Sequence, residues 1–308
     1  MVWLTLALGI LCAGLGGECF VRGAVKLGVR LGIPTAIVAA TLAAFATSSP
    51  EASVAVNASL DGNPEIALGN AIGANVLNIA LTMGIALCFG ALAMPASVER
   101  RDWPVALGAP VLTALLAVDG SLSRLDGVVL LTVFTSWIVL TLRDARAHRA
   151  EADPDRTVAP WWRIMLFSIA GLGLLVLAGD LIVDAAIQIG EMFGWNTFVI
   201  GATLVSFGTT LPELATTLIS RLKGHGDIGV GSVVGSNIFN GLFIVGLASV
   251  IHPIRVDHRV AYVGFGFGLL ALLWMRPKGG IMPRSRSALL LGTYVIYLIV
   301  ILFQGSGA

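Results

Sequence analysis

The chain has 308 residues, of which 56% are hydrophobic and only 12% are charged, and its mean hydropathy is +0.90. Soluble globular proteins carry about 25% charged residues, so this composition excludes a soluble protein and indicates an integral membrane protein. The formal net charge is +1. We therefore expect the protein to lie in the lipid bilayer, and we expect no nucleic-acid partner.

Apolar stretches recur along the chain, each near the ~20 residues that a helix needs to cross the hydrocarbon core. The first has no basic residues before it, so we interpret it as a retained helix and not as a cleaved signal peptide. Two stretches contain proline followed by glutamate and are too long and too interrupted for simple spans. The ten stretches lie at 2–21, 33–58, 65–92, 104–118, 126–142, 162–182, 196–220, 227–250, 260–275 and 287–303.

The two proline-glutamate pairs, Pro50-Glu51 and Pro212-Glu213, mark an internal duplication with an offset of 213 − 51 = 162. The same offset aligns Ala40-Thr41-Leu42 with Ala202-Thr203-Leu204, Gly73 with Gly235, Asn75 with Asn237, and Asn78 with Asn240. Five spans separate equivalent points of the two copies. Because five is odd, the second copy enters the membrane in the opposite sense, an arrangement common among secondary transporters.

The fold class predicted in this way is an all-α membrane protein with ten transmembrane helices in two inverted five-helix repeats, in which helices 2 and 7 are broken. Residues 1–142 form the first repeat, residues 143–161 a polar linker, and residues 162–308 the second repeat.

The placement of Lys and Arg predicts the orientation. If the ten spans alternate, 16 of the 19 basic residues fall in loops on one side, and only Arg124, Arg255 and Arg259 fall on the other. Cytoplasmic loops carry the excess of basic residues. We therefore expect both termini outside, a cytoplasmic linker, and a location in a prokaryotic inner membrane.

Glu51 and Glu213 are the first candidates for function, because carboxylates at bilayer depth are costly and usually functional. Proline leaves preceding carbonyls without helical partners, here near Ala44 to Thr47 and near Ser206 to Thr209. These groups must be satisfied by protein, water or a bound ion.

Hydroxyl side chains occur three and four residues before each glutamate, on the same face of a regular helix. They are Thr47 and Ser48 in the first copy, and Thr209 and Thr210 in the second. Carbonyl, hydroxyl and carboxylate oxygens are the ligands of hard cations. In the following helix of each copy, Asn78 and Asn240 can offer neutral oxygens or hold the glutamates.

Structural explanations exist for each feature taken alone. A single proline in a membrane helix usually makes a kink, a single Ser or Thr often bonds its own backbone, and asparagine can join helices. The two glutamates are harder to explain in this way, because stretches 33–58 and 196–220 contain no Lys or Arg to neutralise them.

The paired motifs resemble the two α-repeats of sodium/calcium exchangers, in the calcium/cation antiporter superfamily. The first copy reads Thr47-Ser48-Ser49-Pro50-Glu51 and Gly73-Ala74-Asn75-Val76-Leu77-Asn78. The second reads Gly208-Thr209-Thr210-Leu211-Pro212-Glu213 and Gly235-Ser236-Asn237-Ile238-Phe239-Asn240. The resemblance covers essentially the whole chain and implies ten helices and exchange of Na+ for Ca2+ by alternating access.

The resemblance also implies the ligands of a central cation site. Glu51 and Glu213 are the main ligands, with Asn78 and Asn240 in the middle of the site. Further oxygens come from the side chains of Thr47, Ser48, Thr209, Thr210 and Ser236 and from the backbone carbonyls of Ala44 and Ser206. Two departures from many microbial relatives stand out: Ala74 where they have Ser, and Asn240 where they have Asp.

The expected function is an ion-coupled cation antiporter whose partners are Ca2+ and Na+, with no cofactor and with a monomer sufficient for transport. An antiporter that exchanges H+ for Ca2+ or another divalent cation is the main alternative, and a passive cation channel is a weaker one. A membrane enzyme with the two glutamates as acid and base would need a lateral opening for its substrate. The chain has no phosphate loop and no zinc-protease motif, so we expect no enzyme.

Overall fold

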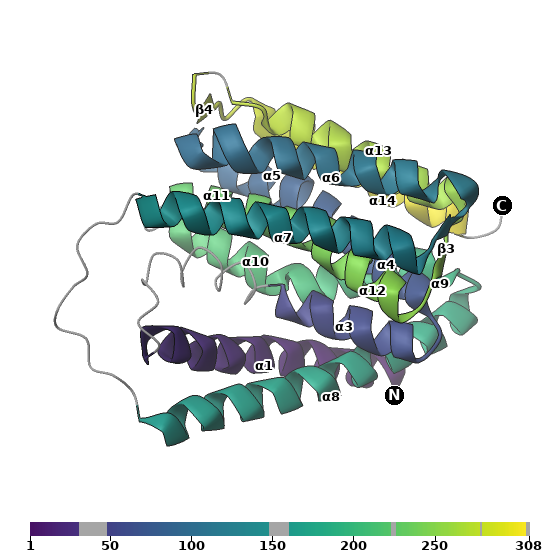
Figure 1. Ribbon diagram of the computed structural model, residues 1–308. Coiled ribbons are helices and arrows are strands. Elements are labelled where there is room, and N and C mark those ends of the chain that lie inside the picture. Colours follow the sequence, from purple (N-terminus) through teal and green to yellow (C-terminus); the bar gives the residue numbers. More distant parts are fainter. Residues whose placement is uncertain (31–47, 148–159, 223–225, 278, 306–308) are drawn as a thin grey trace.

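The computed structural model is a bundle of helices and describes residues 1–30, 48–147, 160–222, 226–277 and 279–305 (Figure 1). The elements of the first half are α1 (Val2–Arg30), α3 (Ser49–Leu60), α4 (Pro64–Val76), η1 (Leu77–Thr82), α5 (Met83–Cys88), β1 (Leu92–Ala93), η2 (Val98–Asp102), α6 (Trp103–Leu116), η3 (Ala117–Asp119), β2 (Ser121–Leu122) and α7 (Arg124–Ala147). Those of the second half are α8 (Trp161–Phe193), α9 (Thr197–Ile200), η4 (Gly201–Val205), α10 (Ser206–Leu222), α11 (Gly226–Ile238), η5 (Phe239–Ile244), α12 (Val245–Ile251), β3 (Ile254–Arg255), α13 (His258–Met275), β4 (Ile281–Met282) and α14 (Arg286–Gly305).

The described residues contain seven helices that are long and apolar enough to cross a membrane, or eight if one bent pair counts as a span. An all-α, multi-pass membrane protein is therefore confirmed. Of the other predicted spans, the first corresponds to a shorter apolar helix at Val2–Gly16, and most of 33–58 lies outside the described residues.

Two helices are longer than their apolar stretches predicted. The stretch 2–21 belongs to α1, which ends at Arg30, and the stretch 162–182 belongs to α8, which ends at Phe193. Helical hydrogen bonding continues beyond the hydrophobic segment into polar turns, which a hydropathy window does not register. Next to the predicted linker 143–161, α7 ends at Ala147 and α8 begins at Trp161.

The duplication is visible in the secondary structure. Helices α4 and α11 have bounds that differ by 162 residues, and so do η1 and η5. Segments η1 and η5 are π-helical, a rare form that often occurs at functional sites. Each of these two segments contains one asparagine of the predicted site, Asn78 or Asn240.

Two short antiparallel strand pairs close opposite ends of the bundle (Figure 1). Strand β1 pairs with β4, and β2 pairs with β3. Because β1 and β3 are equivalent at the 162-residue offset, equivalent strands of the two halves lie at opposite ends.

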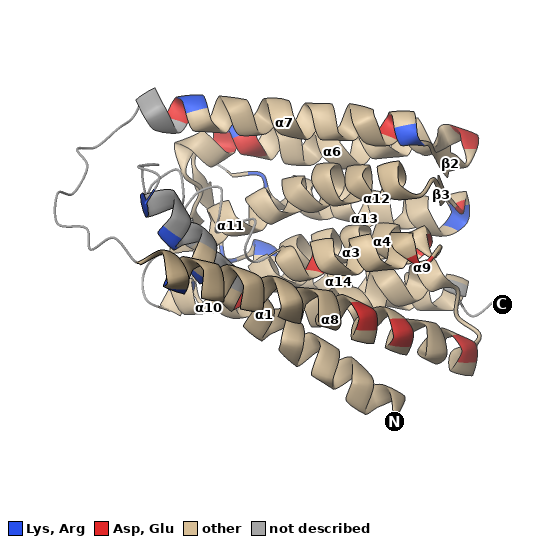
Figure 2. Ribbon diagram, turned by 60° about the horizontal axis from the view of Figure 1, so that its bottom comes forward, with Lys and Arg blue, Asp and Glu red and all other residues tan. Residues whose placement is uncertain are grey.

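Helices α1 and α8 pack side by side along one face of the bundle, next to α3 (Figure 1). A smaller apolar core joins α1, α3, α8 and α9, whereas a larger one joins α4 to α7 with α11 to α14. Figure 2 shows most Lys and Arg positions at the end of the bundle away from the N-terminus. Acidic positions of α8 lie toward the other end, and Asp180 and Asp184 are exposed there.

Candidate cation site

One predicted glutamate lies where a helix begins, and the other lies where a helix bends. Glu51 is in the first turn of α3, directly after Pro50, where the missing N–H of proline costs no helical hydrogen bond. In the second half, the helix bends by 45° between Thr197–Leu211 and Glu213–Leu222. The interruption expected in the seventh helix is therefore present. Glu51 is 0% exposed and Glu213 is 1% exposed.

Hydrogen bonds between α3 and α10 link each glutamate to a hydroxyl of the other repeat. The Ser48 hydroxyl donates to Oε1 of Glu213 over 3.4 Å, and the Thr210 hydroxyl donates to Oε1 of Glu51 over 3.3 Å. The two bonds are equivalent, because 48 + 162 = 210 and 51 + 162 = 213. Each hydroxyl precedes the glutamate of its own repeat by three residues, so the two hydrogen bonds cross reciprocally between the repeats.

The asparagines of the π-helices are buried in the same crossed arrangement. Segment η1, with Asn78, packs against α10, and segment η5, with Asn240, packs against α3. Both side chains are 0% exposed, and their amide oxygens and nitrogens accept or donate no hydrogen bond within the described part of the chain. A buried amide without a partner is costly, so these two groups are suited to meet a ligand.

Thr209 makes a further contact between the repeats. Its hydroxyl is 3.2 Å from Oδ1 of Asn70 on α4 and 3.4 Å from the carbonyl oxygen of Ser206 on its own helix. Asn70 and Thr209 are both 0% exposed. Sequence analysis missed Asn70, although the spacing 70, 74, 78 places it on the helix face of Ala74 and Asn78.

The remaining predicted residues fall into two groups. Ser236 on α11 and Ser206 at the start of α10 are buried, and the Ser206 hydroxyl donates to the Thr203 carbonyl over 3.0 Å. Thr47 and Ala44 lie outside the described residues. Sequence analysis also missed Thr82, whose buried hydroxyl in η1 has no hydrogen-bond partner among the described residues.

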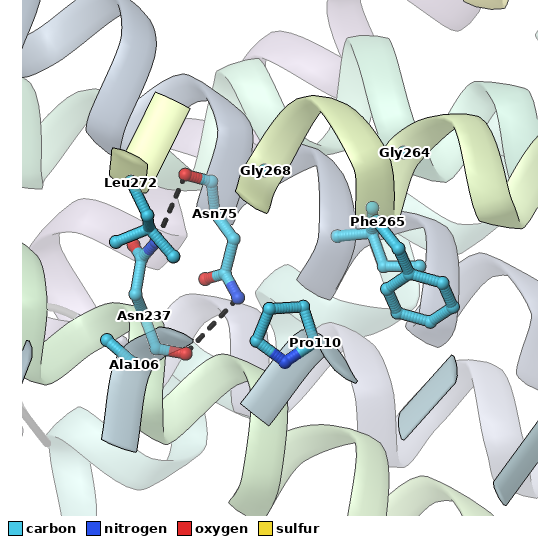
Figure 3. A pocket seen from close by; sticks show the side chains of 9 residues that line it. Asn75, Ala106, Pro110, Asn237, Gly264, Phe265, Gly268 and Leu272 are labelled. Atoms are coloured by element: carbon cyan, nitrogen blue, oxygen red, sulfur yellow. Dashed lines mark hydrogen bonds between the residues drawn. The ribbon is translucent and has the colours of Figure 1, made fainter. Parts of the chain in front are cut away.

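A second reciprocal pair joins α4 to α11 (Figure 3). The side-chain amide of Asn75 donates to the backbone carbonyl of Asn237 over 3.2 Å, and Asn237 returns the same bond to Asn75 over 3.2 Å. A small cavity of about 20 Å³ lies beside this pair, with Pro110 of α6 and Phe265 of α13 in its wall. Asn75 and Asn237 therefore join the two repeats by hydrogen bonds, which is the structural role that asparagine can have between membrane helices.

A larger cavity, of about 330 Å³, lies between α1 and α10 and reaches Thr209. Its lining is Ile10, Leu11, Ala13, Gly14, Leu15, Gly208, Thr209 and Leu211. At Gly208 the helices come close, because an added Cβ would lie 2.6 Å from Cδ1 of Ile10.

The chemistry of the site is that of a hard cation. Two carboxylates are surrounded by hydroxyl and amide groups, and no cluster of three or more His, Cys, Asp or Glu side chains occurs in the described residues. Such a set lacks the nitrogen and sulfur ligands that zinc and other transition metals prefer. Oxygen ligands with two negative charges suit Ca2+ or several Na+ ions.

Comparison with known proteins agrees with this chemistry. The family model described as "Sodium/calcium exchanger protein" matches residues 1–143 and 163–303. The chain is 34% identical over 277 residues to the "Putative antiporter CaxA" of Alkalimonas amylolytica, covering 86% of each chain. It is 30% identical over 309 residues to "Inner membrane protein YrbG" of Escherichia coli K12, covering 95% of this chain and 94% of that one.

A solved structure of the sodium-calcium exchanger NCX_Mj, soaked with Na+ and Sr2+, superposes with a TM-score of 0.69 at 28% identity. The match covers 97% of this chain and 99% of that one. The chain therefore has the fold of that exchanger. The match is to a family of transporters, and the alternative of a membrane enzyme is dropped. The chain belongs to the sodium/calcium exchanger family of membrane ion antiporters.

Proposed function

We propose that this protein exchanges Na+ for Ca2+ by alternating access at one central site that both repeats build. The observation that carries the proposal is the reciprocal pair of hydrogen bonds, from Ser48 to Glu213 and from Thr210 to Glu51. A site made of equivalent residues from two repeats is what a transporter with its binding site at the repeat interface requires.

The charge of the site supports Ca2+ as the divalent ion. Two ionised carboxylates are balanced by one Ca2+, whereas two buried charges without a counterion would cost several kcal/mol each. Ca2+ takes six to eight oxygens, of which bidentate Glu51 and Glu213 supply about four. Mg2+ keeps its waters and prefers a tight octahedron, so it fits this site less well.

The neutral oxygens complete the proposed site and allow Na+ to replace Ca2+. They are the side chains of Thr47, Ser48, Thr209, Thr210, Ser236, Asn78 and Asn240 and the backbone carbonyls of Ala44 and Ser206. Because both ions need the same two carboxylates, occupancy by one excludes the other. This competition couples the opposite movements of the two ions.

The inverted relation of the halves supports alternating access. Elements α4 and η1 recur as α11 and η5, while the equivalent strands β1 and β3 lie at opposite ends of the bundle (Figure 1). The basic end shown in Figure 2 is assigned to the cytoplasm, which leaves both termini outside an inner membrane.

The test is Ca2+ uptake into vesicles of purified protein, with an outward gradient of Na+, K+ or H+ imposed in turn. We expect uptake with the Na+ gradient, and none with the K+ gradient. Uptake driven only by H+ would replace the proposal by proton/calcium antiport, and uptake without any counter-gradient would replace it by a channel.

A further inference from the structure

Asn70 is a buried side chain at the repeat interface to which neither the sequence motifs nor the proposed ligand set gives a role. It lies on α4, is 0% exposed, and accepts a hydrogen bond from the Thr209 hydroxyl of α10 over 3.2 Å. Its Nδ2 has no hydrogen-bond partner among the described residues. Leaving a buried donor unpaired costs about 1–3 kcal/mol, which calls for a compensating role.

The Thr209 hydroxyl has one proton and several acceptors around it. Oδ1 of Asn70 lies at 3.2 Å and the carbonyl oxygen of Ser206 at 3.4 Å. The Glu51 carboxylate also interacts with this hydroxyl. A hydroxyl that donates to its own helix, as Thr and Ser often do in membranes, occupies that carbonyl. When the hydroxyl donates its proton to Asn70, it does not donate to the Ser206 carbonyl. That carbonyl oxygen and the lone pairs of Thr209 Oγ1 then remain available to another partner.

We propose that Asn70 is a positioning residue for the cation site: by accepting the Thr209 proton, it frees the Ser206 carbonyl and the Thr209 hydroxyl oxygen to bind a cation. The inference rests on the proposed function and adds to it a residue that acts through Thr209 without touching the ion.

The two repeats differ at this position, because the counterpart of Asn70 is Ser232, at 70 + 162. A serine side chain is shorter by one heavy-atom bond and has no carbonyl acceptor. The asparagine acceptor is therefore present only where α4 meets α10, and the equivalent position of the second repeat has a serine. Asn70 lies one turn from Ala74, where the first repeat lacks the hydroxyl that Ser236 gives the second.

Binding of Na+ depends on the Asn70–Thr209 hydrogen bond more than binding of Ca2+ does. The two carboxylates can hold Ca2+ by charge, whereas Na+ ions beyond the second must rely on neutral oxygens such as hydroxyls and carbonyls. Loss of the Asn70 acceptor is therefore expected to weaken Na+ binding selectively.

The experiment compares Asn70→Ser, which copies the second repeat, and Asn70→Leu with a matched control, Asn57→Leu. Asn57 is a half-buried amide on α3 whose hydrogen bonds stay within that helix, to Ser53. Both Asn70 variants are expected to raise the KM for Na+ roughly fivefold, the effect of about one neutral hydrogen bond, while the KM for Ca2+ changes less than twofold. Asn70→Asp keeps the acceptor, so its KM for Na+ is expected to stay at or below that of the parent.

A double-mutant cycle with Thr209→Val separates positioning from a general structural effect. If Asn70 acts through Thr209, the Asn70→Ser change has no further effect on Na+ once the hydroxyl is gone. Additive effects, or an unchanged KM for Na+ in Asn70→Ser, would overturn the proposal.

The rise in melting temperature with Na+, measured on the same purified proteins, reports binding without transport. If the parent protein does not couple Na+ to Ca2+, the proposed function fails. The melting series still decides whether Asn70 controls Na+ binding: a parent-like Na+ response in Asn70→Ser refutes it.

Discussion

Replacement of Glu51 by glutamine is expected to stabilise the ion-free protein while removing its response to Ca2+. The side chain is 0% exposed, so ionising it without a bound cation costs several kcal/mol, and glutamine removes that cost. Glutamine keeps the shape and can still accept the Thr210 hydrogen bond, which spans 3.3 Å in the parent. Each kcal/mol gained raises the melting temperature by roughly 2–4 °C.

The loss of the Ca2+ response follows from the same burial. Removing one partner of a buried charge pair costs about 3–5 kcal/mol, which is at least a hundredfold in affinity. At a Ca2+ concentration of 100 Kd, the parent gains about 2.7 kcal/mol of stability from the ligand. At that concentration a variant with a hundredfold weaker site gains only about 0.4 kcal/mol.

The assay is thermal unfolding of purified protein over a Ca2+ titration, for the parent, Glu51→Gln and Glu213→Gln. The matched control is Glu65→Gln, in the first turn of α4 and half-buried, which is expected to respond to Ca2+ like the parent. A parent-like Ca2+ shift in either site variant would refute the two-glutamate site, whatever the transport result.

Three other substitutions test separate parts of the account. Ala74→Ser adds the hydroxyl that Ser236 provides in the other repeat, so apparent Na+ affinity in transport is expected to rise several-fold, and an unchanged Na+ dependence would place position 74 outside the site. Asn240→Asp adds a third carboxylate, which changes the charge of the ionised ligand set from about −2 to about −3. With three Na+ exchanged for one Ca2+, net charge would then move in the Ca2+-loaded step instead of the Na+-loaded step. Voltage-clamped measurement of the two half-reactions checks this, and the same distribution of charge movement in both proteins would exclude Asn240 from the site. Asn237→Ala removes one of two reciprocal hydrogen bonds with Asn75, so the free energy of unfolding is expected to fall by about 0.5–1.5 kcal/mol, and an unchanged melting temperature would deny the pair a structural role.

The spans and the glutamates could be predicted because their signals are local. Hydropathy marks residues that must face lipid or core, and a carboxylate such as Glu51 inside an apolar stretch contrasts sharply with its neighbours. The repeat register was also readable, since the 162-residue offset recovers both the α4–α11 and the η1–η5 correspondence.

The crossed contacts could not be predicted, because they depend on how helices from distant parts of the chain meet. Equivalence of Ser48 with Thr210 says nothing about which glutamate each hydroxyl reaches. Asn70 could not be predicted from the duplication, because its counterpart in the second repeat is Ser232. The π-helical form of η1 and η5 could not be predicted either, since nearly every residue of these segments is buried and they carry no amphipathic pattern that would show a wider turn.

The central claim is that Na+ and Ca2+ share one site built around Glu51 and Glu213. Equilibrium binding of Ca2+ to the purified protein at rising Na+ concentrations tests it most directly. The account predicts that Na+ raises the apparent Kd for Ca2+ without changing the number of Ca2+ ions bound at saturation, and that Glu213→Gln binds no Ca2+ in the same range. Ca2+ binding that is indifferent to Na+ would contradict a shared site.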